Sequence, residues 1–258
     1  MRRFAAKAAR RLGRWVVAGD HGAYHIAAAS RYLGGVKGAS VLVAGCNTGE
    51  ECHRFIEAGA GRVTGVDVIE EVGAEFAHPN VEYHRMSIED LSLPDGEFDL
   101  VYCFATLEHV GRIDLAYPEL VRVTRPSGIV YCVAAPLWNS RVGHHKGDIF
   151  ESFPWIHLAL DRDEILAWCS EQELQTFAGL PIEAHVDYML NDEYFNKHPA
   201  ASYVDVCARL QHVDVIAHTL AFDAASDLQG DLAAKLAAKG YSTLELAASV
   251  HTFVARRT

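Results

Sequence analysis

A glycine-rich stretch near the start of the chain has the residue types with which proteins bind a ligand through the backbone. In "VLVAGCNTGEE", residues 41–51, a short apolar run is followed by Gly45 and Gly49. Glycine accepts positive φ and lets the main chain approach a ligand closely. Asp67 lies at the end of a second apolar run, where a carboxylate can accept hydrogen bonds from both hydroxyls of a ribose. This order predicts a nucleotide-like ligand, although an aspartate there can also cap a helix.

Histidines form a second group of residues that could do chemistry. His109 lies in "LEHV", His144 and His145 lie in "VGHHKGD", and His157 lies in "PWIHL". Histidine titrates near neutral pH, so it suits a general base, a group that binds an anion, or a metal ligand. With Asp148, three of these histidines could hold a metal, but their spacing matches no strong ligand pattern. Polar packing between two parts of the protein is an equally good interpretation for any one of them.

Short apolar runs alternate with helical segments along most of the chain, and these elements must position the candidate residues. We expect strands at residues 41–44, 63–66, 81–84, 98–103 and 128–134. The tail repeats the alternation with a strand at 214–222, a helix at 231–241 and a last strand at 249–257. Such alternation predicts an α/β fold with a doubly wound, mostly parallel sheet. Ligands bind at the carboxyl ends of the strands in this class.

One segment breaks this rhythm and is rich in histidine, tryptophan and phenylalanine. Within it, Asp161 and Glu164 form a D-x-x-E capping pattern before an apolar helix. We interpret the segment as an inserted cap over the strand ends. The chain is therefore predicted to be a single domain, residues 1–258. Its parts are a helical lead-in at 1–39, a ligand-binding core at 40–136, the cap at 137–200, and the last two strands with a helix at 201–258.

The charge balance bears on the partners of the protein. The net charge is −11, which argues against a nucleic-acid partner. The first 15 residues nevertheless hold six basic groups and no acidic one. A helix there could touch an anionic membrane surface, but a solvated, frayed terminal helix is the more common outcome. Oligomeric state is not predicted.

The cysteines and the hydropathy profile bear on the compartment. The six cysteines are scattered, and none forms a C-x-x-C pair. This pattern is typical of buried free thiols in a reducing environment, and predicts a cytoplasmic protein. The apolar stretch "WVVAG" is shorter than the core of a secretory signal. No apolar run approaches the roughly 18 residues of a spanning helix.

Four stretches in order resemble the class I S-adenosylmethionine-dependent methyltransferases, and most closely the type 11 methyltransferase domain. These stretches are "VLVAGCNTGEE", "VTGVDV", "MSIEDLSLPDGEFDLVYCFATLEHV" and "ELVRVTRPSGIVYCVAAP". Together they cover about residues 40–136, and weaker similarity in the tail implies the last two strands of that seven-stranded, Rossmann-like fold. The resemblance implies S-adenosylmethionine as cofactor and S-adenosylhomocysteine as product.

The resemblance also implies roles for individual residues. The loop from Gly45 to Gly49, with Cys46 and Asn47 inside it, would lie under the methionine part of the cofactor. Asp67 would hold the ribose. The remaining cofactor contacts implied by the family are adenine packing by Val68, hydrogen bonds to the adenine from Ser87 and the Ile88 backbone, and a position near the sulfonium for Phe104.

The chain departs from the family pattern at three of these positions. The family often has an acid where this chain has Val43, a glycine at Asn47, and an aspartate at Ser87. Asparagine tolerates the left-handed region better than most residues, so Asn47 need not break the turn. Val43 removes an acid that often helps to bind the methionine ammonium. Glu50 or Glu51 could replace it, although acids at a helix start also favour the helix dipole.

Methyl transfer needs a nucleophile held in line with the carbon–sulfur bond, and a base only when that nucleophile is protonated. By their position after the strands, His109 and His145 are the candidate catalytic residues. The candidates for substrate binding are His144, Trp155, His157, Tyr24 and Arg31. Structural packing competes with function for each, and no metal is assigned.

The leading prediction is therefore a methyltransferase that acts on a hydroxyl or amine of a small polar molecule, such as a sugar, a natural product or a small acid. Two other functions share parts of the pattern. A binding module could keep the cofactor and lack the reaction, which the residues at 43, 47 and 87 would allow. A nicotinamide-dependent oxidoreductase shares the glycine loop and the acid, but the loop lacks the G-x-G-x-x-G spacing.

Overall fold

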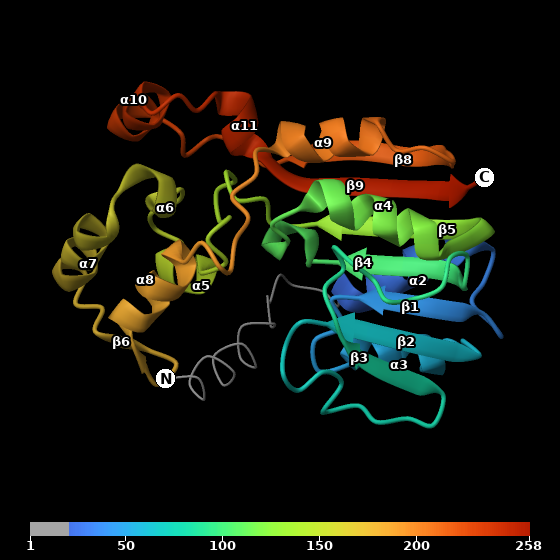
Figure 1. Ribbon diagram of the computed structural model, residues 1–258. Coiled ribbons are helices and arrows are strands. Elements are labelled where there is room, and N and C mark those ends of the chain that lie inside the picture. Colours follow the sequence, from blue (N-terminus) through green and yellow to red (C-terminus); the bar gives the residue numbers. More distant parts are fainter. Residues whose placement is uncertain (1–20) are drawn as a thin grey trace.

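A seven-stranded sheet lies at the centre of the protein, seen in a computed structural model that describes residues 21–258 (Figure 1). The strand order is β3-β2-β1-β4-β5-β9-β8. The bounds of the strands are β1 Ser40–Ala44, β2 Arg62–Asp67, β3 Val81–Arg85, β4 Phe98–Phe104, β5 Thr124–Ala134, β8 Val213–Phe222 and β9 Ala248–Arg257. All seven predicted strands and the predicted α/β class are confirmed. The basic segment at 1–15 lies outside the described residues.

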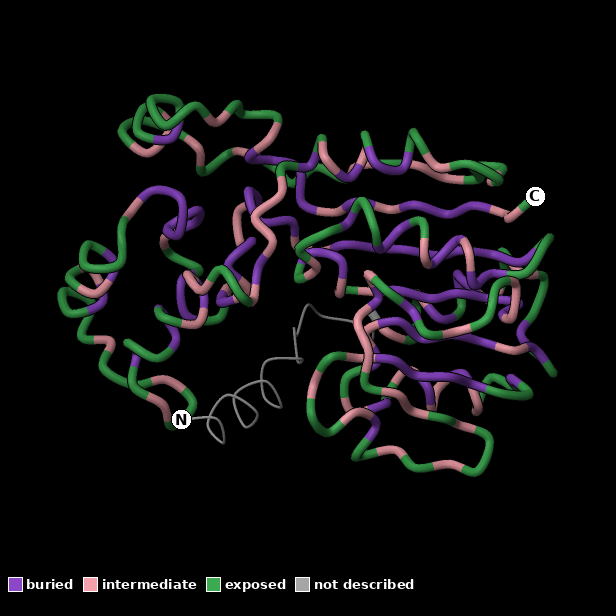
Figure 2. The backbone as a smooth tube through the Cα atoms, in the orientation of Figure 1, coloured by how far each residue is buried: buried purple, intermediate pink, exposed green. Residues whose placement is uncertain are grey.

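The pairing of the strands explains their sequences. β1, β2, β3, β4 and β5 pair in parallel, whereas β9 runs antiparallel to both β5 and β8. Parallel strands covered on both faces read as continuous apolar runs, and β1 and β4 are buried almost throughout (Figure 2). Since β1, β2 and β4 are parallel, the loops that follow them meet at one edge of the sheet. We call this the carboxyl edge.

Helices cover both faces of the sheet. α2 (His21–Leu33) and α3 (Glu50–Glu57) pack on one face, and α4 (Ile113–Val123) and α9 (Ala200–Ala208) pack on the other. Each layer has its own apolar cluster, since alternate residues of β1 face opposite sides. Among residues 21–258, no helix has the length and apolar character that crossing a membrane requires. All six cysteines are free and buried, as predicted.

The predicted cap is a separate group of short helices beside the carboxyl edge (Figure 1). Its elements are α5 Gly147–Phe150, α6 Ile156–Ala159, α7 Arg162–Glu171, the hairpin β6 Thr176–Phe177 and β7 Leu180–Pro181, and α8 Ile182–Leu190. The predicted capping box begins α7. Glu164 N donates to the Asp161 carboxylate at 2.9 Å, and Asp161 N donates to the Glu164 carboxylate at 2.8 Å.

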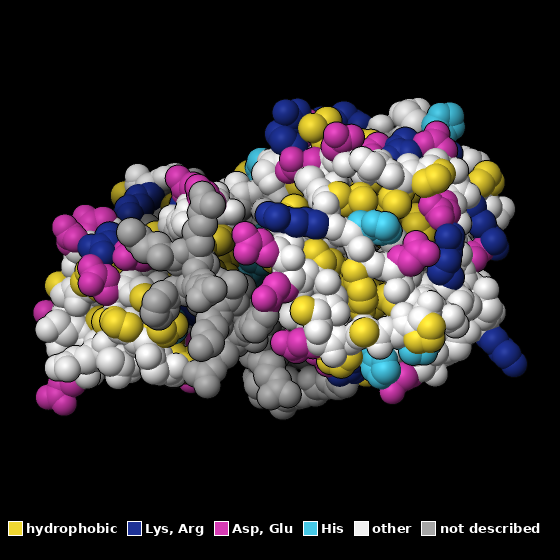
Figure 3. Space-filling model, turned by 60° about the horizontal axis from the view of Figure 1, so that its bottom comes forward, with side chains coloured by type: hydrophobic (Ala, Val, Ile, Leu, Met, Phe, Trp, Pro, Cys, Tyr) yellow, Lys and Arg dark blue, Asp and Glu magenta, His cyan; other side chains and the backbone are white. Residues whose placement is uncertain are grey.

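A second segment completes the cap. α10 (Gly230–Ala238) and α11 (Thr243–Ala247) lie between β8 and β9 in the chain, and α10 packs beside α6 whereas α11 packs beside β9. Leu236 and Leu246 from this segment share an apolar cluster with Trp138 and Trp155. The cap is therefore built from two stretches of chain, and residues 223–247 belong to it rather than to the sheet. On the face shown in Figure 3, acidic and basic side chains are interspersed.

Candidate active site

The glycine loop connects β1 to α3 at the carboxyl edge. Gly45 has φ 81°, Asn47 has φ 48° and Gly49 has φ 103°, so three residues of the loop are left-handed. Asn47 adopts the conformation that asparagine tolerates best among the non-glycine residues. The N–H groups of Gly45 and Cys46 both donate to Val66 O, at 2.8 and 3.1 Å. The loop is thereby fixed against the end of β2.

Replacing Gly45 by alanine should destabilise the protein more than the same change at Gly179. Both glycines have φ +81°, but a Cβ at Gly45 would collide with the Thr106 side chain, whereas a Cβ at Gly179 has nothing within 4 Å. The left-handed backbone costs each alanine about 1 kcal/mol. The collision should add roughly 1–3 kcal/mol at Gly45 alone. Urea unfolding of both variants measures the difference. Equal losses would mean that Thr106 moves aside without cost.

Asp67 lies beside this loop at the end of β2. One carboxylate oxygen accepts from Asn47 N at 2.8 Å, and the other accepts from Val68 N at 2.7 Å and Ile69 N at 3.2 Å. A carboxylate has about four lone-pair sites, and three are used here, so one site remains for a hydroxyl donor, on the oxygen that accepts from Asn47 N. The next side chain, Val68, is 61% exposed, which is unusual for valine at a strand end. An acid with one spare acceptor site beside an accessible apolar surface fits a ribose hydroxyl and an adenine.

Ser87 and Ile88, the two residues after β3 that are predicted to contact the adenine, differ in their surroundings. Ser87 Oγ accepts from Glu89 N at 3.1 Å and so holds the turn. Ile88 is buried in the core beneath α4, so only its backbone remains for a ligand. The hydroxyl of Ser87 therefore already has one structural partner.

Phe104 ends β4 close to the glycine loop. Its ring lies 4.4 Å from that of His25 on α2, and Thr106 donates to Phe104 O at 3.0 Å. His25 Nδ1 in turn lies 2.7 Å from the Tyr131 hydroxyl. α2 therefore covers the side of the carboxyl edge where Phe104 lies.

Val43 faces the layer between the sheet and α2. It is 2% exposed and is paired across β1 and β4 with Tyr102. Glu50 is bound to Arg54 at 2.7 Å, whereas Glu51 is close enough to Tyr102 to help burial raise the pKa of that phenol. Of the two acids that could replace the missing one, Glu51 is the one directed toward this layer.

A cluster of three titratable residues lies after β4. Glu108 and His109 belong to the turn η1 (Leu107–His109), and His145 comes from the cap. One ligand atom from each residue lies within 4.8 Å of those of the other two, and the rings of His109 and His145 are 4.9 Å apart. Phe195 packs against both rings, at 5.2 and 4.9 Å. The structure thus brings together the two histidines predicted to be catalytic.

Burial controls the protonation of this cluster. Glu108 is 2% exposed, and burial raises its pKa to about 8. Neither of its carboxylate oxygens has a hydrogen-bond partner among the described residues, although the nearby backbone of Glu108 itself and of Ala135 lowers the pKa against the larger effect of burial. Burial also lowers the pKa of His109 and of His145. At neutral pH the cluster therefore holds a protonated carboxyl and two neutral imidazoles.

The tautomer of His109 follows from its neighbour. His109 Nδ1 lies 2.5 Å from Tyr194 O, and a carbonyl can only accept, so Nδ1 carries the proton and donates it. Nε2 then has a free lone pair, 3.9 Å from the Glu108 carboxyl. His109 has the arrangement of a general base, since one nitrogen is oriented by the backbone and the other is available.

The other cap residues predicted to bind substrate lie deeper. His144 is fully buried, and its Nδ1 accepts from Lys146 N at 3.0 Å. His157 Nε2 donates to Trp138 O at 2.7 Å, and burial lowers its pKa to about 4. Trp155 is fully buried and donates to Leu246 O at 3.0 Å. The contact of Trp155 with Leu246 joins the two stretches of the cap to each other, and the other two contacts lie within the first stretch.

The metal alternative suggested by sequence does not match the described geometry. His144, His157 and Asp148 are not among the described donor groups that lie close enough to share a cation. Glu108, His109 and His145 are close enough, so the cluster can act as a base or as a set of ligands. The sequence reasoning missed Glu108 and Phe195, although Glu108 directly precedes His109.

Tyr24 and Arg31 lie on α2, seven residues apart and both exposed. They therefore share one helix face, about 10 Å apart along the axis. Tyr24 packs edge-on against His25 at 5.1 Å and so adjoins the Phe104 side of the site. Arg31 lies toward the other end of the helix, near Tyr131, whose pKa it lowers slightly against the stronger effect of burial.

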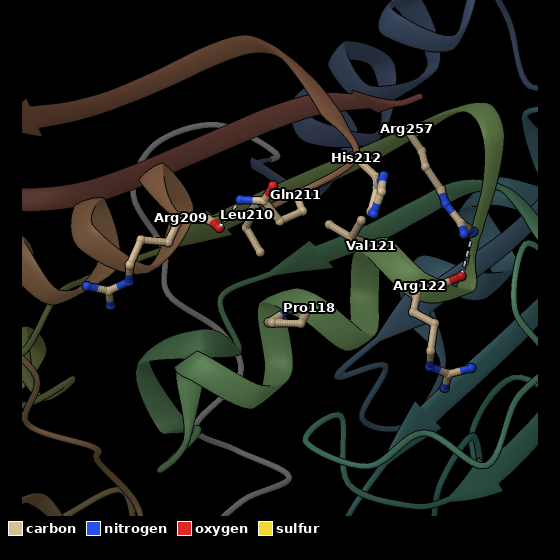
Figure 4. Close-up of a pocket in the computed structure, with 8 residues that line it drawn as sticks. All are labelled: Pro118, Val121, Arg122, Arg209, Leu210, Gln211, His212 and Arg257. Carbon is tan, nitrogen blue, oxygen red and sulfur yellow. Dashed lines mark hydrogen bonds between the residues drawn. The ribbon is translucent and has the colours of Figure 1, made fainter.

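A pocket at the opposite edge of the sheet is distinct from this site (Figure 4). Its volume is about 320 Å³, and it lies between the end of α4, the residues after α9 and the end of β9. Two of the arginines that line it already have partners. Arg257 donates to Arg122 O at 2.7 Å, and Arg122 binds Glu119 at 2.7 Å. The pocket therefore takes no part in the carboxyl-edge chemistry.

Residues 42–132 match the methyltransferase domain family. The ubiquinone biosynthesis O-methyltransferase of Aromatoleum aromaticum is 35% identical over 104 residues, which are 38% of this chain and 44% of that protein. The chain thus spans less than half the length of this curated relative.

Two solved structures share the fold over most of the chain. An S-adenosylmethionine-dependent methyltransferase from Mesorhizobium loti has a TM-score of 0.54 and 17% identity, and covers 90% of this chain and 96% of its own. The 1,6-didemethyltoxoflavin-N1-methyltransferase of Burkholderia thailandensis, solved with S-adenosylhomocysteine, has a TM-score of 0.50 and 14% identity, and covers 92% and 78%. Residues 42–132 therefore belong to the methyltransferase domain family, and the chain has the fold of the class I S-adenosylmethionine-dependent methyltransferases.

Proposed function

We propose that the chain transfers a methyl group from S-adenosylmethionine to a hydroxyl of a small polar molecule, with His109 as the general base. One observation carries the proposal. The glycine loop with Asp67 and the cluster of Glu108, His109 and His145 stand at the same edge of the sheet, because they follow the parallel strands β1, β2 and β4. A cofactor surface and a base therefore adjoin each other, as an acceptor placed between them would require.

The residues of the cofactor surface have complementary tasks. Asp67 would accept a hydrogen bond from a ribose hydroxyl, and the exposed side chain of Val68 would pack on the adenine. The left-handed loop at Gly45 and Asn47 would let the backbone lie against the methionine portion. Bound S-adenosylmethionine supplies a methyl group already activated by its sulfonium charge. We assign Glu51 to the methionine ammonium in place of the acid that Val43 replaces.

The part of the site that would hold the acceptor contains aromatic side chains as well as titratable ones. Phe195 packs against both histidines of the cluster and against Trp138, at 5.3 Å. Lys146 lies 4.5 Å over the ring of Tyr188, and burial lowers its pKa to about 8. These surfaces favour a small acceptor with a flat apolar part and a polar group. His109 Nε2 would take the proton of the acceptor hydroxyl as the oxygen attacks the methyl carbon.

An amine acceptor is the second candidate. A neutral amine is already nucleophilic and needs no base during transfer, so His109 would then only bind or orient it. The neutral state of both histidines suits either acceptor, because desolvation lowers the pKa of each and neither repels a positive charge at neutral pH. The dependence of the rate on His109 separates the two.

Replacing Asp67 by asparagine should weaken S-adenosylmethionine binding about 10- to 100-fold, because hydrogen bonds to a charged acceptor contribute roughly 1.5–3 kcal/mol each. Isothermal titration of the full chain measures the change. The matched control is Asp163→Asn, an exposed aspartate in the first turn of α7, which should bind like the wild type. Urea unfolding shows whether the variant keeps the loop in place.

Two outcomes would contradict the proposal. If the wild type shows no binding at millimolar cofactor, the carboxyl edge does not serve S-adenosylmethionine. If Asp67→Asn binds as tightly as Asp163→Asn while both remain folded, the ribose contact has been assigned to the wrong residue.

A further inference from the structure

A second group of donor atoms lies away from the carboxyl-edge site, between α9 and the last two strands. It consists of Cys207 on α9, His218 on β8 and His251 on β9. One ligand atom from each residue lies within 4.8 Å of those of the other two. Cys207 and His251 are buried, and His218 is partly exposed.

The strand register places both histidines on one face of the sheet. His218 pairs with Phe253, and Leu220 pairs with His251, so the two histidines are diagonal neighbours across an antiparallel pair. Their rings are 5.3 Å apart. α9 packs against β8 and β9, and its last turn carries Cys207 over this face. Three elements that are far apart in sequence thus direct donors to one point.

The two histidines each have a ring nitrogen without a hydrogen-bond partner in the described part of the chain. The Nε2 atoms of His251 and His218 are buried and have no hydrogen-bond partner among residues 21–258. His251 Nδ1 lies 3.1 Å from the Tyr117 hydroxyl. If Nδ1–H donates to this oxygen, Nε2 of a fully buried histidine is left as an acceptor with nothing to accept. A buried polar atom of this kind needs an explanation, and an absent ion is one.

We propose that Cys207, His218 and His251 bind a thiophilic metal ion, with Zn²⁺ the expected occupant and one coordination position left to water. A thiolate with two imidazoles suits zinc, which takes nitrogen and sulfur ligands in a tetrahedral arrangement. Such ligand atoms lie about 3.3–3.8 Å apart around zinc, so the three side chains must draw together slightly. His218 is the partly exposed member and provides the entry path.

Binding of the ion would release one proton. A bond forms between Cys207 Sγ and the ion, the S–H bond breaks, and one proton passes to solvent. Both imidazoles donate through neutral nitrogens and release nothing. Tyr117 is the outer partner of the site, since its hydroxyl accepts from His251 Nδ1 and also reaches the Cys207 thiol. An oxygen partner on the second nitrogen of a ligating histidine is the usual arrangement.

The site would connect to the catalytic region through α9. Tyr203, one turn before Cys207, lies 5.5 Å from the His251 ring and donates to Leu107 O at 3.4 Å. Leu107 begins the turn that carries Glu108 and His109. A bound ion would therefore hold α9 against the sheet beneath that turn, and its role is structural rather than catalytic.

Cobalt titration of the full chain tests the site, because Co²⁺ replaces Zn²⁺ and gives absorption bands that report thiolate ligation. We expect one Co²⁺ per chain with a thiolate-to-cobalt charge-transfer band, which added Zn²⁺ abolishes. Calorimetry in buffers of different ionisation enthalpy should show release of one proton per ion. Cys207→Ser should lose the charge-transfer band, and His218→Ala should weaken binding without disturbing a buried position. Tyr117→Phe should weaken binding about 10- to 100-fold as an outer partner.

Matched controls separate this site from the rest of the chain. Cys169→Ser changes another buried free thiol in the cap, and His212→Ala changes an exposed histidine close to β8. Both should bind Co²⁺ as the wild type does. His145→Ala removes a donor of the carboxyl-edge cluster and should also leave the band unchanged. Failure to observe the band in the folded wild type, its survival in Cys207→Ser, or its loss in His145→Ala would each overturn the proposal.

Discussion

Replacement of His109 by glutamine should lower the rate of methyl transfer to a hydroxyl acceptor about 100- to 10,000-fold, the usual range for loss of a general base. Glutamine can still donate to Tyr194 O, but it offers no basic nitrogen in place of Nε2. The affinity for S-adenosylmethionine should stay the same, since His109 is assigned to the acceptor and not to the cofactor. Transfer of a labelled methyl group to acceptors in a cell extract measures the rate.

The control for this variant is His53→Gln. The side chain of His53 on α3 is 41% exposed against 35% for His109, so the two histidines differ in position more than in accessibility. The control should transfer methyl groups at the wild-type rate. An unchanged rate in His109→Gln would leave an amine as the acceptor and remove the base from the mechanism. Cofactor binding with no transfer by the wild type would indicate a binding module.

The pH profile gives an independent test. Burial lowers the pKa of His109, so its lone pair remains available below pH 6.5, the ordinary value for histidine. The wild-type rate should therefore stay level through pH 6.5 and fall only in more acidic solution. His109→Gln should lose this acid limb. If His109→Gln keeps the fall in rate at acidic pH, the titration of another residue causes that fall.

A chelator distinguishes a base from a metal ligand at the same cluster. The donors of Glu108, His109 and His145 are close enough to share a divalent cation. Activity that survives the chelator supports His109 as the base. Activity that is lost and then restored by a cation in Cys207→Ser, which lacks the thiolate of the site on α9, as well as in the wild type would make all three residues ligands. Glu108→Gln would then be as inactive as His109→Gln.

Local sequence was sufficient to predict the sheet and the glycine loop. The apolar runs of β1 and β4 are buried on both faces, so the strand pattern needs no knowledge of distant partners. The left-handed loop can also be predicted from local sequence, because Gly45 and Gly49 are glycines and therefore accept positive φ. Asp67 follows from strand order, since adjacent parallel strands end at the same edge.

The features that could not be predicted from the sequence depend on contacts between residues far apart in the chain. Nothing near "PWIHL" shows that Trp155 contacts Leu246, because this contact needs the segment between β8 and β9 to fold onto the cap. The contact of His157 with Trp138 joins residues 19 apart and is equally absent from the local pattern. Val43 is similar. Its position in the family motif suggested a missing ligand contact, whereas its surroundings show a buried valine beside Tyr102.

The charge state of Glu108 is the clearest case of this kind. An acid next to a histidine in "LEHV" reads as an exposed polar pair. The structure instead buries the carboxyl without a hydrogen-bond partner among the described residues, and so keeps its proton on at neutral pH. A neutral Glu108 does not attract a proton to His109 Nε2, 3.9 Å away. The buried acid therefore helps to keep its neighbour available as a base.

This burial predicts a stability that falls with rising pH. The pKa of Glu108 is about 8 in the folded protein against 4.5 for an ordinary glutamate, so the folded state binds more protons than the unfolded state between these values. Stability from this residue is complete below pH 4.5 and is lost as pH rises, at up to about 1.4 kcal/mol per pH unit. Urea unfolding from pH 5 to 9 measures the slope.

Two substitutions of Glu108 isolate the effect. Glu108→Gln keeps the shape and a neutral group, and Glu108→Leu removes the polar atoms, so both should abolish the residue's share of the slope. Glu108→Leu should also be the more stable, because replacing a buried polar group by an apolar one of similar size is often favourable. The exposed Glu82→Gln is the control and should follow the wild type. Parallel pH dependences for wild type and Glu108→Gln would show that the carboxyl is ionised in the folded state, and His109 would then carry a proton more readily than a general base should.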